Sequence, residues 1–189
     1  MPDAECRECA DWSPAIVAAR FAYELAPPVD DLVHGLKYEG WRELAAFMGR
    51  AMARLDPPPG DAGRGAVIVP IPTTPDRRRT RGYNQAELLA RRVAELRELP
   101  LVPALARHAA AGSQTTLTRD ERRRNVRGAF APTARAGEVR GRDVLLVDDV
   151  LTTGATVSAA ADTLADAGCG GVVVLAFARA EGSGTREVA

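Results

Sequence analysis

The sequence lacks long apolar runs and lacks an excess of charge of either sign. No run approaches the ~20 apolar residues that cross a bilayer, and the segment from Met1 to Trp12 is polar and acidic, unlike a secretory signal. The 25 basic and 25 acidic residues cancel, so the chain as a whole has no electrostatic attraction to nucleic acid or to anionic lipid. These absences predict a cytoplasmic protein with no membrane partner.

Cysteine is scarce, with three residues in the chain. Cys169 stands alone between a predicted helix and a predicted strand, and we expect it to behave as a small apolar residue. Cys6 and Cys9 form a C-x-x-C pair, which is half of the ligand set of a zinc ribbon. One pair cannot close a tetrahedral site, so no zinc is expected. An intersubunit zinc, a lost first pair and a truncated start remain as alternatives.

Aromatic residues make up 5% of the chain, and lysine occurs once, at Lys37. Few aromatic side chains are interleaved with the basic stretches, and these stretches are short. Because single-stranded nucleic acid is held by stacking on aromatic rings within a basic groove, direct DNA binding is disfavoured.

The remaining composition is typical of one soluble globular protein, with 46% hydrophobic and 26% charged residues in a chain of 189. Apolar residues at helical spacing from Val29 to Leu55 predict two amphipathic helices. The Pro- and Gly-rich segment 56–63 is typical of a linker. We therefore expect an N-terminal helical segment, residues 1–60, and a core, residues 61–189.

The core alternates predicted strands and helices. Apolar runs predict strands at 66–72, around 101–105, at 144–147 and at 172–177, and helices are predicted from about Asn84 to Leu96 and over 155–167. Strands that alternate with helices form parallel sheets. The sequence thus predicts an α/β fold with a parallel sheet flanked by helices.

The most informative segment is the acidic pair Asp148 and Asp149, directly after the buried strand 144–147. Ligands of open α/β sheets bind at the carboxyl ends of the strands. A hydroxyl-rich turn, 152–156, leads from the acids into a helix, and such a turn suits a phosphate. Because the acids repel phosphate, we expect them to face sugar hydroxyls or a divalent cation, which a phosphorylated ribose with magnesium supplies. The alternative is an Asp-rich cap of an ordinary helix.

Four arginines gather in the five residues Arg77 to Arg81, after the first core strand and before a helix. Guanidinium groups pair with phosphate oxygens, and the strand end places this cluster near the acidic segment. A solvated basic loop is the other interpretation. The cluster is predicted to bind a polyphosphate.

The segment from Val144 to Thr156 resembles the phosphoribosyl pyrophosphate (PRPP) motif of type I phosphoribosyltransferases. The order of further short matches is similar to the ComF/GntX branch of that family, although the N-terminal cysteine module is reduced here. These matches are Leu36-Lys37-Tyr38, Gly40, Arg79, Arg81-Gly82-Tyr83-Asn84-Gln85, Gln114, Arg122, Asn125 and Gly128-Ala129-Phe130.

This resemblance implies a three-layer, phosphoribosyltransferase-like (Rossmann-like) fold with a small N-terminal helical hood. It also implies that Asp148 and Asp149 are the catalytic pair, contacting the ribose hydroxyls with Mg²⁺ nearby. The 5-phosphate would be held by Thr152, Thr153, Gly154, Ala155 and Thr156. The expected pyrophosphate contacts are Thr73, Thr74, Arg79, Arg81 and Lys37, and the expected lid or acceptor side comprises Tyr83, Asn84, Gln85, Gln114, Arg122 and Asn125.

The implied activity is a Mg²⁺-dependent transfer of the 5-phosphoribosyl group from PRPP to a nitrogenous acceptor, with release of pyrophosphate. Positioning and electrostatics would supply the rate without a protein nucleophile. No base-stacking set lies near the motif, so the acceptor cannot be read from the sequence. The alternative is a non-catalytic PRPP- or nucleotide-binding accessory factor in DNA uptake, with a helicase or single-stranded DNA as partner. An oligomer is compatible with either hypothesis.

Overall fold

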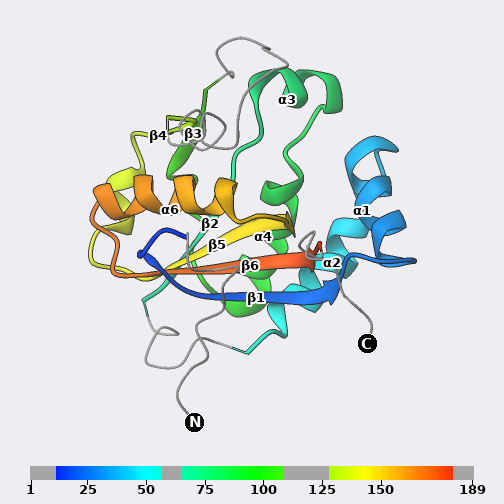
Figure 1. The fold of residues 1–189 in the computed structure, drawn as a ribbon, viewed down its shortest axis with the longest axis horizontal. Coiled ribbons are helices and arrows are strands. Elements are labelled where there is room, and N and C mark those ends of the chain that lie inside the picture. Colours follow the sequence, from blue (N-terminus) through cyan, green and yellow to red (C-terminus); the bar gives the residue numbers. More distant parts are fainter. Residues whose placement is uncertain (1–11, 57–64, 109–127, 181–189) are drawn as a thin grey trace, which may run out of the picture.

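The computed structural model describes residues 12–56, 65–108 and 128–180. A four-stranded parallel sheet forms its centre, in the order β1-β6-β5-β2 (Figure 1). The strands are β1 (Ile16–Glu24), β2 (Val67–Pro70), β5 (Val144–Leu151) and β6 (Val172–Arg179). Their shared direction brings all four carboxyl ends to one edge of the sheet.

The two central strands, β5 and β6, are nearly continuous apolar runs, as expected of strands that are covered on both faces. The helix α6 (Ala155–Asp166) connects them as a crossover. Its packing face is rich in alanine, which allows the helix to lie close to the strands. The predicted strand–helix–strand unit is therefore confirmed, with slightly longer strands.

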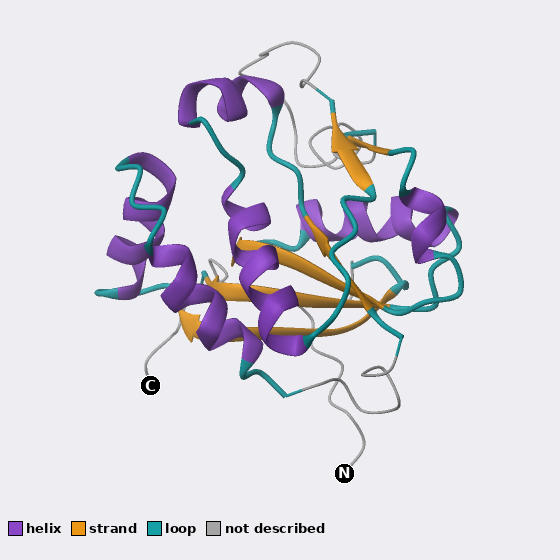
Figure 2. Ribbon diagram, turned by 180° about the vertical axis from the view of Figure 1, so that it is seen from behind, coloured by secondary structure: helices purple, strands orange, loops and turns teal. Residues whose placement is uncertain are grey.

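Helices cover the two faces of the sheet to give three layers. One core cluster joins Val144, Leu146 and Val174 to α6. The other joins Leu145, Val147 and Leu175 to the helices α1 (Val29–Tyr38), α2 (Leu44–Ala53) and α4 (Gln85–Arg97). Figure 1 shows α6 in front of the strands, and Figure 2, from behind, shows the helices of the opposite layer in front. The predicted α/β fold is confirmed.

The helix α3 (Pro75–Arg81) and a small antiparallel sheet lie above the main sheet in the view of Figure 1. The small sheet pairs β3 (Leu105–Arg107) with β4 (Phe130–Pro132), and the 3-10 helix η1 (Ala136–Val139) follows it. None of the helices in the described ranges is long and apolar enough to cross a membrane.

The structure corrects two predictions. The segment 101–105 is not a strand of the main sheet: Leu101 makes one parallel bridge to Ile68, and the chain then turns away before β3 begins. The strand β1 was missed, because its burial is only partial and its sequence lacks a strong apolar pattern. It lies in the segment assigned to the helical hood, and it pairs with β6 as an edge strand. The predicted boundary at residue 60 lies outside the described residues.

Candidate active site at the carboxyl end of β5

The acidic pair lies inside β5. Main-chain pairing with β6 continues through Asp148, opposite Ala176, to Leu151. Asp149 is 3% exposed, and Asp148 is partly buried. The strand is thus longer than the apolar run 144–147 predicts, because the pairing with β6 does not depend on the side chains. Both carboxylates consequently lie on a rigid element at the carboxyl edge of the sheet.

The turn after β5 leads directly into α6. Gly154 occupies the N-cap position with φ +78°, a left-handed conformation that glycine adopts without strain. No side chain caps this helix. The first amide groups of a helix have no partner inside the helix, and here they point out of the N-terminus with the positive end of the helix dipole. The turn 152–156 therefore offers an anion a set of free donors.

Burial and the charge of the neighbouring Asp149 raise the pKa of Asp148. Its Oδ1 atom accepts a hydrogen bond of 2.9 Å from the backbone N–H of Asp149. Desolvation, followed by the charge of Asp149, raises the pKa of Asp148 from 3.8 to about 8, although that hydrogen bond and Lys37 oppose the change. Asp148 therefore holds its proton to a higher pH than an exposed aspartate does, and a bound cation would oppose this shift.

Lys37 brings the helix α1 into the site. Its Nζ atom lies 3.1 Å from Oδ2 of Asp149, and the two side chains are 21% and 5% exposed. The same Oδ2 atom is buried without a hydrogen bond of good geometry in the described part of the chain. Lys37 was predicted to contact pyrophosphate, and the structure places it on the acidic pair.

Tyr83 anchors α1 next to this lysine. Its hydroxyl donates to the backbone carbonyl of Leu36, and its ring is buried beneath the guanidinium of Arg42. Asn84 is also buried, and its Nδ2 atom donates to the carbonyl of Ile71. These two predicted lid or acceptor residues therefore tie α1 and the end of β2 to the start of α4.

The predicted pyrophosphate residues lie on or beside α3, which has no buried residue. Thr74 caps this helix by accepting from the backbone N–H of Arg77. Arg79 pairs with Asp76 on the same helix. Arg81 donates to Gln85 and lies over the ring of Tyr38. Thr73 is partly buried just before the cap. The arginines thus have partners within or beside their own helix.

Arg107, at the end of β3, was missed by the sequence analysis. Its guanidinium lies over the ring of Phe130. Burial and the positive charge of Arg77 lower the pKa of Arg107, and Asp148 opposes this change. Arg107 therefore interacts electrostatically with both the arginine cluster and the acidic pair. No local pattern marks it, because β3 is only three residues long.

Trp12 was also missed. Its indole lies against Gly154, so that a Cβ atom added to this glycine would be 2.2 Å from Nε1. The remaining predicted residues of the lid, Gln114, Arg122 and Asn125, and the pair Cys6 and Cys9 lie outside the described residues.

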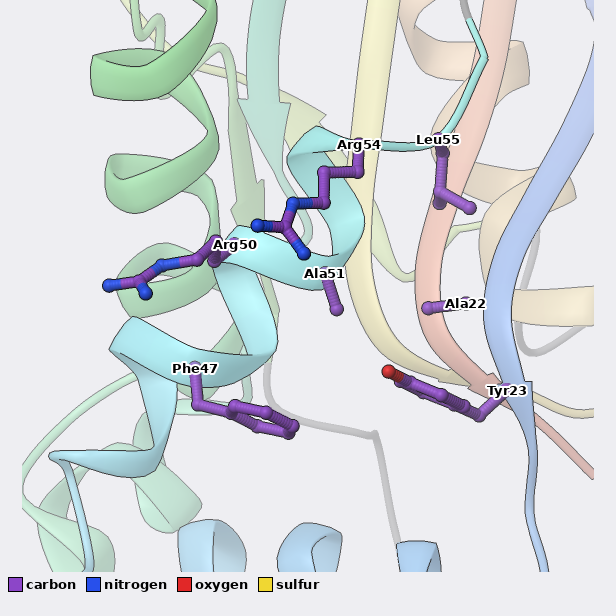
Figure 3. A pocket seen from close by; sticks show the side chains of 7 residues that line it. All are labelled: Ala22, Tyr23, Phe47, Arg50, Ala51, Arg54 and Leu55. Carbon is purple, nitrogen blue, oxygen red and sulfur yellow. The ribbon is translucent and has the colours of Figure 1, made fainter.

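A cavity of about 260 Å³ lies elsewhere, between α2 and the end of β1 (Figure 3). None of the predicted site residues lines it; its walls are Ala22, Tyr23, Phe47, Arg50, Ala51, Arg54 and Leu55. The candidate site is thus defined by its charges and its free amides at the strand ends.

Comparison with known proteins agrees with this geometry. The family model described as phosphoribosyl transferase domain matches residues 80–188, more than half of the chain. Competence protein F of Haemophilus influenzae is 33% identical over 115 residues, which cover 60% of this chain and 50% of that protein. The chain therefore spans about half the length of that relative.

Two further relatives match longer segments. DNA utilization protein YhgH of Escherichia coli K12 is 30% identical over 179 residues, covering 92% of this chain and 77% of that protein. Bifunctional protein PyrR of Leifsonia xyli is 35% identical over 128 residues, covering 65% of this chain and 64% of that protein. The matched domain and the extent of these similarities show that the chain belongs to the phosphoribosyltransferase domain family, as a member of its ComF-like branch.

Proposed function

We propose that this chain binds PRPP at the carboxyl end of β5 and transfers its 5-phosphoribosyl group to a nitrogenous acceptor. The observation that carries the proposal is the position of two carboxylates beside an uncapped helix N-terminus. The carboxylates suit sugar hydroxyls, and the amides suit the ester phosphate. A phosphorylated pentose presents both kinds of group on one molecule.

Each end of the ribose phosphate has its own partners in this proposal. Asp148 and Asp149 accept hydrogen bonds from the two ribose hydroxyls. The turn from Thr152 to Thr156 donates to the 5-phosphate through its amides and hydroxyls. Both contacts lie on β5 and the start of α6, so the sugar is fixed by a rigid part of the fold.

Magnesium fits this site as an ion that the carboxylates and the bound substrate would hold together. The described residues contain no cluster of three or more metal-binding side chains. Mg²⁺, however, commonly uses one or two carboxylates together with oxygens of a phosphorylated substrate. Asp148 and Asp149 would hold it, and the buried Oδ2 of Asp149 lacks a good hydrogen bond. Bound there with PRPP, the ion would neutralise charge on the leaving pyrophosphate.

The cations of the site face the pyrophosphate in this proposal. Arg79 and Arg81 would leave their present partners, and Thr73, Thr74 and Lys37 would complete the contacts. Arg107 joins this group, because it interacts electrostatically with both Arg77 and Asp148. These charges would stabilise the pyrophosphate as the bond from C1 of the ribose to its oxygen breaks. The bond from C1 to the acceptor nitrogen forms, and the acceptor gives up a proton.

The alternative is an accessory protein that binds PRPP or a nucleotide without turnover. Two observations favour it. Arg79 and Arg81 are already paired, with Asp76 and Gln85, and two relatives bear names that refer to competence and to DNA utilization. In that case a helicase or single-stranded DNA would be the partner. The same PRPP site would then bind its ligand without catalysing a transfer.

Two measurements separate the hypotheses. Calorimetric titration of the full chain with PRPP and Mg²⁺ is expected to show saturable binding, and its absence would contradict both. Pyrophosphate release across a panel of bases and amines is then expected with at least one acceptor. Binding without release for every acceptor would favour the accessory role.

A further inference from the structure

Trp12 lies at the turn that the proposed function assigns to the 5-phosphate. The atoms nearest to a Cβ built on Gly154 all belong to its indole: Nε1 at 2.2 Å, Cε2 at 2.3 Å and Cζ2 at 2.7 Å. The indole therefore occupies the space that a side chain at position 154 would need. The requirement for glycine here has two causes, the positive φ and this aromatic ring.

The Nε1 atom of Trp12 is a donor without a partner. It is buried from solvent and has no hydrogen bond within the described ranges. Buried indole N–H groups usually find an acceptor, because burying an unpaired donor is costly. The indole lies against Gly154, the residue before α6 begins, and the N-terminus of this helix has no side-chain cap.

The main chain around Trp12 is fixed against the same helix. The backbone N–H of Ser13 donates to Oγ of Ser158, in the second turn of α6, at 3.2 Å. Two residues later, the carbonyl of Ala15 accepts from the N–H of Val172 at the start of β6. Ser13 itself is buried. The indole is consequently presented to the turn by a segment that is attached to both α6 and the sheet.

We infer that Trp12 forms one wall of the phosphate-binding turn and that its indole, now closed off from solvent, shifts on ligand binding so that its N–H donates a hydrogen bond to the phosphate held there. This inference rests on the proposed function, because the phosphate is that of PRPP. The indole adds a neutral donor to the amides of the helix N-terminus. It also excludes water from one side of the anion, which strengthens the hydrogen bonds of the other donors.

The position of Trp12 gives the N-terminal segment a role in the site. The residue reaches the turn from the opposite end of the chain, ahead of β1. A displacement of this segment would remove one donor and one wall together. The inferred contact therefore makes PRPP affinity depend on how residues 12–15 pack against α6.

The test uses the two tryptophans of the full chain, Trp12 and Trp41, whose ¹⁵N-labelled indole groups give one resonance each. The variants Trp12→Phe and Trp41→Phe assign the two signals. Trp41 is a matched control, because it packs against Gly35 in α1, and it is half-exposed. The ligands are PRPP with Mg²⁺, ribose 5-phosphate, and ribose without a phosphate.

We expect PRPP and ribose 5-phosphate to move the Trp12 indole proton downfield, while ribose leaves it unchanged and Trp41 responds weakly. Trp12→Phe should weaken PRPP binding about 10-fold, as expected for the loss of one charge-assisted hydrogen bond, and Trp41→Phe should not. The wild-type titration needs no variant to fold correctly, since Trp41→Phe alone assigns both signals.

Two outcomes would overturn the inference in different ways. If calorimetry shows that PRPP binds to the wild-type chain while the Trp12 resonance stays unmoved, the inference about Trp12 is wrong and the proposed function stands. If the wild-type chain binds neither PRPP nor ribose 5-phosphate, the proposed function itself fails and this inference fails with it.

Discussion

The two charged regions of the candidate site differ in how the fold holds them. The acidic region, from Asp148 to the start of α6, lies on a central strand between two cores. The arginine region, α3, has no buried residue, and its side chains pair locally. A charge on a buried strand affects folding as well as binding, whereas a charge on an exposed helix affects mainly binding. Variants in the two regions should therefore separate these effects.

The largest expected effect belongs to the double variant Asp148→Asn with Asp149→Asn. Each carboxylate would lose a charge-assisted hydrogen bond to a ribose hydroxyl, worth about 1.5–3 kcal/mol, and together these losses lower PRPP affinity by at least about 100-fold. Asn keeps the shape of Asp, so the circular dichroism spectrum should not change. Unchanged calorimetric affinity in a folded variant would contradict the assignment of the acidic pair.

Lys37→Met should destabilise the folded chain. It leaves Asp149 charged and buried without its cation, which we expect to lower the free energy of unfolding by about 2 kcal/mol. This is below the cost for a fully buried pair, because Lys37 is 21% exposed. Urea denaturation measures the change, and Lys37→Arg, which retains the charge, is the control. Equal stability of the Met variant and the wild type would show that the ion pair does not contribute.

Asp148→Asn should also change how stability depends on pH. Since the pKa of Asp148 is raised in the folded chain to about 8, the folded state binds its proton more tightly than the unfolded state does. The resulting stabilisation is fully present below the unfolded pKa and is lost as the pH rises through about 8. This group alone contributes a slope of up to about 1.4 kcal/mol per pH unit in that window.

The measurement for this prediction is urea denaturation of both proteins between pH 4 and pH 8. The wild-type chain should lose more stability than Asp148→Asn as the pH rises. Parallel curves for the two proteins would show that Asp148 ionises normally in the folded state.

Arg79→Ala should have the smallest effect on stability. It removes an exposed ion pair with Asp76 on the same helix, and such pairs are worth at most about 1 kcal/mol. PRPP affinity should fall several-fold, and the difference from the wild type should shrink as salt is added, because exposed charges are screened. A large loss of stability in this variant would contradict the description of α3 as a helix with no buried residue. Asp76→Ala, which frees Arg79, should leave PRPP affinity equal or higher.

The acidic region was predictable because its parts are adjacent in sequence. Four apolar residues, two acids and a turn ending in Gly154 follow one another, so local patterning is enough to place them on a strand, a loop and a helix. The end of the strand was placed too early, at Val147, because hydropathy does not report the main-chain pairing that carries β5 through the acids to Leu151.

The missed parts depend on partners that are distant in the chain. The strand β1 has a partly exposed, alanine-containing sequence, and it becomes a strand by pairing with β6 more than 150 residues later. Lys37 was predicted to contact pyrophosphate, and its pairing with Asp149 follows only from how α1 packs beside the acidic pair. Arg107 follows a short apolar stretch that contains no functional motif. Its electrostatic interaction with Asp148 arises only from the position of β3 in the fold.

The order of residues by itself determined the strand–acid–turn–helix unit and hence the family, because hydrophobic burial, helix initiation and anion binding at a helix N-terminus are local consequences of neighbouring residues. Only the tertiary structure decided which cation neutralises Asp149, which arginine approaches Asp148, and which aromatic ring covers Gly154. These pairings form between segments that are distant in the sequence. The chain contains many residues of the same chemical type, and only the packing of the fold determines which of them come into contact.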